Sequence, residues 1–167
     1  LTAGVSVGTG TVAANNEWSA FGLKYAMNTG DAAVTLGYST KTIETATAAD
    51  NDNTSMGVNI AMGALSFTAS ASTKTGVDED INTQSAGVSY DLGNGLVVAA
   101  ASVKSEDDDD AGEEYDMTTY EAAYTIASGL SAVLNVSDFD YENGTSADAA
   151  TVDESGTITT LNIKASF

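Results

Sequence analysis

Charged side chains on one face of extended segments are the residues of this chain that could act most directly on a solute. Each falls opposite the apolar face of a segment in which apolar and polar residues alternate. Fixed charges of both signs along a water-facing wall would select ions by attraction and repulsion, and this chemistry breaks no bond. The alternative is the solvated face of a soluble sheet. These candidates are Lys24, Lys41, Lys74, Asp91, Glu121 and Lys164.

Missing residue types narrow the possible chemistry further. The chain contains no Cys, no His, no Pro and no Arg. Without Cys or His it has no ligands for a Cys/His metal site, no Ser-His-Asp triad, no thiol nucleophile and no disulfide. Carboxylate, Ser, Thr, Tyr and Lys chemistry stays possible, but no pattern in the sequence singles out such a site. We predict a protein that is not an enzyme and that uses no cofactor and no resident metal.

The charge balance argues against several partners. There are 24 acidic residues against 5 basic ones, a net charge of −19, and this sign opposes binding to nucleic acid. The densest acidic stretch, predicted as a loop over residues 106–116, could gather divalent cations loosely. It lacks the ligand spacing of a calcium-binding loop, and such runs are usually only solvated.

Alternating segments recur along the whole chain and predict an all-β protein. The period-two pattern gives about ten strands in one domain, residues 1–167, with no segment left over for a second domain. The longest apolar run, Leu96–Ala101, is far too short for a spanning helix. Its strand is apolar on both faces, so its orientation stays open. The predicted strands are 1–11, 17–28, 32–44, 54–62, 65–75, 83–92, 96–105, 117–127, 130–141 and 157–167.

The connections between these segments alternate in length. Short Gly-containing turns at residues 29–31, 63–64, 93–95 and 128–129 alternate with longer polar connections. This asymmetry is typical of an antiparallel transmembrane barrel, whereas Greek-key sandwiches do not keep it. Most aromatic residues fall near strand ends, where a membrane barrel carries interfacial girdles. That set is Trp18, Phe21, Tyr25, Tyr38, Tyr90, Tyr120, Tyr124 and Phe167.

The last segment carries the most distinctive pattern. Leu161, Ile163 and Phe167 share one face, and the chain stops on that Phe. This ending resembles the closing strand of bacterial outer-membrane barrels, in which a terminal Phe is the assembly signal. Further phrases resemble those of Gram-negative general porins, especially alphaproteobacterial ones: Phe21-Gly-Leu-Lys-Tyr25, Gly93-Asn-Gly-Leu96 and Tyr120-Glu-Ala-Ala-Tyr124.

The resemblance implies a trimeric sixteen-stranded barrel in the outer-membrane lipid, open to small hydrophilic solutes and ions by passive diffusion. The first residues read as though a turn had preceded them, so we expect the C-terminal part of such a barrel, without its N-terminal strands. The family narrows its channel with an inward loop and facing Arg residues, and this chain has no Arg. The acidic composition favours a cation-leaning channel. Alternatives are a non-porous structural or adhesive barrel and a soluble acidic β-sandwich surface protein.

Overall fold

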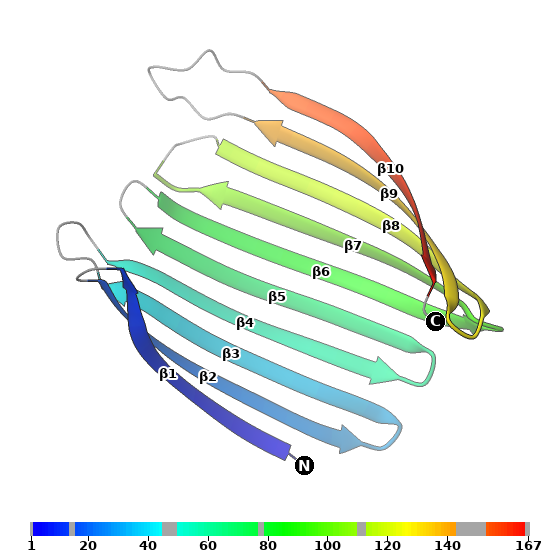
Figure 1. The fold of residues 1–167 in the computed structure, drawn as a ribbon, viewed down its shortest axis with the longest axis horizontal. Coiled ribbons are helices and arrows are strands. Elements are labelled where there is room, and N and C mark those ends of the chain that lie inside the picture. The colour runs from blue at the N-terminus through cyan, green and yellow to red at the C-terminus, as the bar shows by residue number, and fades with distance from the viewer. Residues whose placement is uncertain are drawn as a thin grey trace.

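The described residues form a single antiparallel sheet of ten strands in which every strand pairs with its neighbours in sequence. This computed structural model describes residues 2–13, 16–44, 50–76, 79–109, 113–142 and 153–165. The sheet curves into a trough, so that it has a concave and a convex face (Figure 1). No helix among these residues could cross a membrane. The strands are β1 (Thr2–Ala13), β2 (Asn16–Thr29), β3 (Ala32–Glu44), β4 (Asn51–Met62), β5 (Leu65–Gly76), β6 (Glu79–Gly93), β7 (Leu96–Asp107), β8 (Glu113–Ala127), β9 (Leu130–Glu142) and β10 (Glu154–Ala165).

The two ends of the sheet differ in their connections. At one end, here called the turn end, four turns of two residues join β2 to β3, β4 to β5, β6 to β7 and β8 to β9. At the other, the loop end, the connections run from two residues to eleven. The strands extend further toward the loop end than predicted, so the expected loops over 76–82 and 106–116 are mostly strand. Their alternating polar residues pair across the sheet and continue the backbone ladder.

The turn at Asn94-Gly95 shows how the sequence sets the strand register. Both residues have positive φ, 54° and 80°, which is the requirement of a type I′ turn and the reason for Asn-Gly there. The twist of that turn matches the twist of the strands it joins. Asp91 accepts a hydrogen bond from the Gly93 backbone N–H at 2.8 Å and stabilises the bulge beside the turn.

Strand register divides the side chains into two faces of different chemistry. In an antiparallel pair, directly opposed residues point to the same side of the sheet, so Leu23, Tyr38 and Met56 share one face across β2, β3 and β4. The same face carries Phe67 on β5 and Leu161 on β10 by the same reasoning, and it is the convex one. This apolar band runs across the whole sheet.

Within the part of the chain that the structure describes, the apolar band has no second layer of protein over it. No hydrophobic side chain among the described residues is buried, and Leu36 and Tyr38 are 44% and 40% exposed. A soluble sheet would bury such a face against a core. A continuous, uncovered apolar face of this kind suits contact with lipid hydrocarbon.

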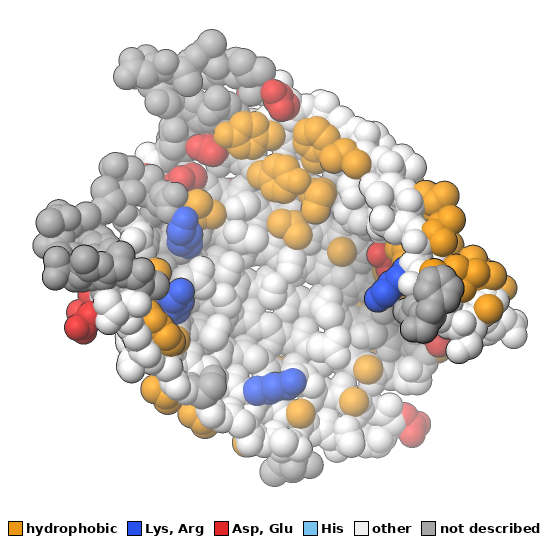
Figure 2. Space-filling view, viewed as in Figure 1, with side chains coloured by type: hydrophobic (Ala, Val, Ile, Leu, Met, Phe, Trp, Pro, Cys, Tyr) orange, Lys and Arg blue, Asp and Glu red, His pale blue; other side chains and the backbone are white. Residues whose placement is uncertain are grey.

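The concave face is mainly small and polar. Looking into the trough, Figure 2 shows Lys side chains over a floor of largely polar atoms and backbone. The orientation of β7, which the sequence left open, follows from its pairing: Val98 and Ala100 lie on the convex face, while Val97 and Ala99 face inward.

Trp18 does not join the aromatic girdle expected for it. It pairs with Gly10 across β1 and β2 and lies on the concave face. Its ring covers two glycines, since a Cβ built on Gly8 would lie only 2.7 Å from the ring atom Cη2. Glycine leaves room for the ring, and the ring in turn covers backbone that no side chain of β1 shields.

The sheet is open at both edges. β1 pairs only with β2 and β10 only with β9 among the described residues. Each edge therefore presents a row of backbone groups whose partners must come from another strand if the sheet lies in hydrocarbon.

Introducing a charged side chain at either of two adjacent residues of β3 tests which face of the sheet contacts lipid. Leu36→Arg should destabilise the protein in lipid vesicles by about 2–4 kcal/mol, because it puts a charge on the lipid side of a barrel strand. Thr35→Arg, one residue away on the concave face, should change the free energy of unfolding far less. Denaturant titrations followed by Trp18 fluorescence measure both, and equal losses for the two variants would contradict the assignment of the faces.

Candidate functional site

The concave wall gathers all six charged residues that the sequence singled out. Strand pairing puts Lys24, Lys41, Lys74 and Lys164 on this face, together with Asp91 and Glu121. They come from six different strands and do not converge on one point. On the described part of the wall these six charges are thus separated from one another.

Lys24 stands in the least crowded part of the wall. Its cross-strand neighbours on β1, β3 and β4 are glycines: Gly4, Gly37 and Gly57. With Gly22 and Ser55 they line a shallow depression of about 640 Å³. No side chain stands directly beside the Lys24 ammonium in its row, so its charge faces the interior of the trough.

Lys41 has an aromatic neighbour on the same wall. Its Nζ lies 5.9 Å from the centre of the Trp18 ring, within the range of a cation–π contact. This contact holds the ammonium near the wall at the loop end of β3. Lys41 and Lys24 therefore differ in setting although both face inward.

The two predicted acidic residues also differ in setting. Asp91 is engaged by the turn it borders, through the Gly93 hydrogen bond described above. Glu121 is half-buried midway along β8, between Ala99 on β7 and Asn135 on β9. Glu121 is therefore the better placed of the two to act on a passing ion.

Pairing adds three inward carboxylates that the sequence analysis did not single out: Asp107, Glu113 and Glu154. Their strands extend into stretches predicted as loops, which hid their orientation. Among the described side chains of the concave face, four Lys thus oppose five carboxylates. The wall is almost balanced in charge, despite the net charge of −19 for the whole chain.

Among the described strands, twice as many carboxylates lie on the convex face, ten in all, beyond the apolar band at the loop end. Register opposes carboxylates directly there, as in the row Glu106, Glu114 and Glu142 and in the pair Asp116 and Asp140. Directly opposed like charges destabilise a sheet. This acidic collar consists of Glu17, Glu44, Asp52, Asp80, Glu106, Glu114, Asp116, Asp138, Asp140 and Glu142.

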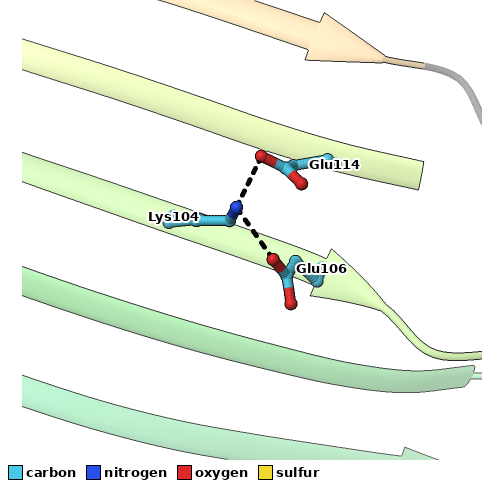
Figure 3. Close-up of polar contacts among 3 residues, drawn as sticks. All are labelled: Lys104, Glu106 and Glu114. Carbon is cyan, nitrogen blue, oxygen red and sulfur yellow. Dashed lines mark ion pairs between the residues drawn. The ribbon is translucent and has the colours of Figure 1, made fainter. Parts of the chain in front are cut away.

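Lys104 relieves part of this repulsion. It is the one Lys on the convex face, and its Nζ lies 2.9 Å from Glu106 and 2.7 Å from Glu114 (Figure 3). The group lies past the apolar band, toward the loops. Hydrogen bonds to Glu114 and Glu106 raise the pKa of Lys104, and the Lys104 ammonium lowers the pKa of Glu114. Burial and then the neighbouring Glu114 raise the pKa of Asp116.

The described residues hold no group of three or more acidic side chains arranged to bind a metal ion. Loose binding of divalent cations to the acidic segments stays a prediction. Of the predicted assembly signal, Leu161 and Ile163 lie on the convex face, 64% and 68% exposed. Phe167 lies outside the described residues.

The chain is similar in sequence pattern and in fold to known porins. The family model of the Gram-negative porins matches residues 1–144. No curated protein sequence matches the chain. An anion-selective porin from Comamonas acidovorans has a similar structure, with a TM-score of 0.69 at 12% identity over 90% of this chain and 49% of that one.

Two further solved structures are similar. The outer membrane protein OpdK of Pseudomonas aeruginosa matches with a TM-score of 0.66 at 14% identity, over 90% of this chain and 49% of that one. A BenF-like porin from Pseudomonas fluorescens Pf-5 matches with a TM-score of 0.66 at 13% identity, over 89% and 48%. At such low identity the likeness concerns the fold alone. The chain spans about half the length of each.

Removing the Lys104 ammonium tests the role of the ion pairs. The lowered pKa of Glu114 means that its contribution to stability is complete above its ordinary value of 4.5 and is lost as the pH falls through its folded value. Lys104→Met should therefore lower the denaturant midpoint modestly at pH 7, and the difference should vanish at a pH that protonates Glu114. Salt at about 1 M should also shrink it. Lys24→Met is the control, and a pH-independent loss in Lys104→Met would contradict the ion-pair explanation.

Proposed function

The chain belongs to the Gram-negative porin family, and we propose that it forms part of the wall of a water-filled channel in the bacterial outer membrane. Small hydrophilic solutes and ions would cross by passive diffusion down their gradients. No bond is made or broken in such a passage, and the wall needs no cofactor. Its residues act by holding water and by attracting or repelling charge.

The observation that carries this proposal is the opposite chemistry of the two faces over most of the sheet, although the inward positions of β7 are also apolar. In the described strands an apolar band crosses the convex face with no protein layer over it, and Gly, Ser, Thr, Asn and Lys predominate on the concave face. A closed barrel with this arrangement keeps hydrocarbon outside and water within. A soluble sandwich would turn its apolar face inward.

Closure of the barrel needs strands beyond these ten. The free edges of β1 and β10 would be paired by further strands, which we place N-terminal to this chain in a longer protein. Support comes from the chain's coverage of about half of each similar solved porin. A homotrimer in outer-membrane lipid, with divalent cations loosely held at the acidic segments, completes the proposal on the strength of the resemblance.

We propose that the channel prefers cations to anions. The reason is the position of the carboxylates at the loop end, and not the net charge of the whole chain. The inward-facing charges are nearly balanced, so the wall itself favours neither sign strongly. The carboxylates of the loop end outnumber Lys there, and they would raise the local cation concentration at the mouth of the channel. Salt screens such steering, so the preference should weaken as ionic strength rises.

Reconstitution of the complete protein in planar bilayers tests the channel and its wall together. Stepwise conductance in KCl is expected. Lys24→Glu should move the reversal potential in a KCl gradient further toward the value for potassium, because the depression around Lys24 would then carry a negative charge. Glu121→Lys should move it the opposite way.

The matched control for these variants is Lys104→Glu. It makes the same change of charge on the convex face, where the side chain does not meet the lumen. In about 1 M KCl, which screens the collar's effect at the mouth, it should move the reversal potential much less than Lys24→Glu does. Absence of any conductance from properly inserted protein would contradict the channel. Equal shifts in Lys24→Glu and Lys104→Glu would contradict the assignment of Lys24 to the wall.

A further inference from the structure

At the loop end of β8 and β9 the concave wall carries four large side chains, three of them aromatic. Tyr115 and Met117 on β8 lie directly opposite Tyr141 and Phe139 on β9. These four side chains, here called the inner aromatic cluster, are half-buried at the loop end. Figure 2 shows the hydrophobic side chains gathered there on the concave face, next to acidic ones.

Contacts hold the inner aromatic cluster in place. The Tyr115 hydroxyl donates to Met117 Sδ at 3.3 Å. The Phe139 ring lies against Gly156 on β10, where an added Cβ would be 3.2 Å from ring atom Cε1. Because that position is glycine, the ring can lie flat against the wall. The cluster is therefore a built surface, with each ring positioned by a neighbour.

Carboxylates lie beside the inner aromatic cluster. The Tyr141 hydroxyl donates to Glu113 Oε1 at 2.9 Å, and Glu154 is the cross-strand partner of Tyr141 on β10. Glu113 pairs with Asp107 on β7. The neighbouring Lys104 points to the convex face. The inward Lys of this row is Lys74 on β5, three strands away from Glu113.

We infer that the inner aromatic cluster and its carboxylates form a binding subsite for small organic cations with an apolar body, such as arylalkylammonium ions. The body would lie on Phe139, Met117 and the two Tyr rings, burying apolar surface that otherwise meets water. The ammonium group would lie beside Glu113 and Glu154, with the ring faces of the tyrosines adding a cation–π contribution. Charge complementarity favours this occupant over an anion carrying the same body. The inference rests on the proposed function for its access through the lumen.

Calorimetric titration of the complete protein in detergent tests binding without relying on conduction. The probe is phenethylammonium. Two comparison ligands separate its parts: 3-phenylpropionate has the ring with a negative charge, and ethylammonium has the charge without the ring. Phenethylammonium should bind at least about tenfold more tightly than either, since both contributions must be present together.

Two variants of the subsite and one control variant test whether phenethylammonium binds at the inner aromatic cluster. Glu113→Gln and Phe139→Thr should each weaken phenethylammonium binding by roughly 3- to 10-fold. Tyr120→Thr, on the opposite face of β8, should leave it unchanged. Glu113→Gln is nearly isosteric and decides the question alone if Phe139→Thr does not fold. Potassium conductance of the same preparations, without the probe, reports the channel separately.

The outcomes separate the subsite from the channel. Phenethylammonium binding weakened by that factor in Glu113→Gln, with potassium conductance still present, supports the subsite. Conductance without phenethylammonium binding overturns the subsite and leaves the channel standing, and this is also the result if another segment of the protein occupies the cluster. Equal binding of 3-phenylpropionate overturns it as well. Binding in a protein that never conducts keeps the subsite and contradicts the channel.

Discussion

The structure depends on one constraint: a continuous backbone ladder must separate two solvents of opposite polarity. Every strand except those at the two edges pairs on both sides, so the backbone of the interior strands can enter hydrocarbon without unpaired polar groups. The period-two alternation then assigns each residue to one solvent. Leu36 and Thr35 are adjacent in the chain yet belong to different environments, and a slip of one residue in register would exchange them.

This constraint also explains where charge can reside. A charged side chain has two acceptable places on such a sheet: the concave wall, or the ends of the strands beyond the apolar band. Lys24 and Glu121 take the first, and the acidic collar takes the second, with Lys104 placed among its carboxylates. The net charge of the chain is therefore a poor guide to the charge of the wall, because ten acidic residues of the described strands face outward at the loop end.

Much of this arrangement could be predicted from sequence, because the pattern that the membrane imposes is local. The number of strands, the four short turns and the facing of Lys24 all follow from alternation and from Gly and Asn at the turns. The long acidic stretch was harder. Its polar residues alternate with other polar residues, so periodicity carries no signal, and only the pairing of Glu106 with Glu114 shows it to be strand. Trp18 was misplaced because its inward position depends on Gly8 and Gly10 of another strand.

The aromatic residues on the concave face of β8 and β9 were also missed in the prediction from sequence. On β8, Tyr120, Thr118 and Asp116 are two residues apart and share the convex face. Met117 and Tyr115 alternate with them and therefore lie on the concave face. That signal was present in the sequence, but it ran against the rule that aromatic residues of a barrel face lipid. Here the position of a residue along the strand, odd or even, decides its face, whatever its type. The backbone hydrogen bonds of a paired strand do not allow a single side chain to turn to the other face. When the type of a residue suggests one face and its alternating position along a paired strand suggests the other, the position decides. Large apolar residues found on the water-facing side in this way need another explanation for being there.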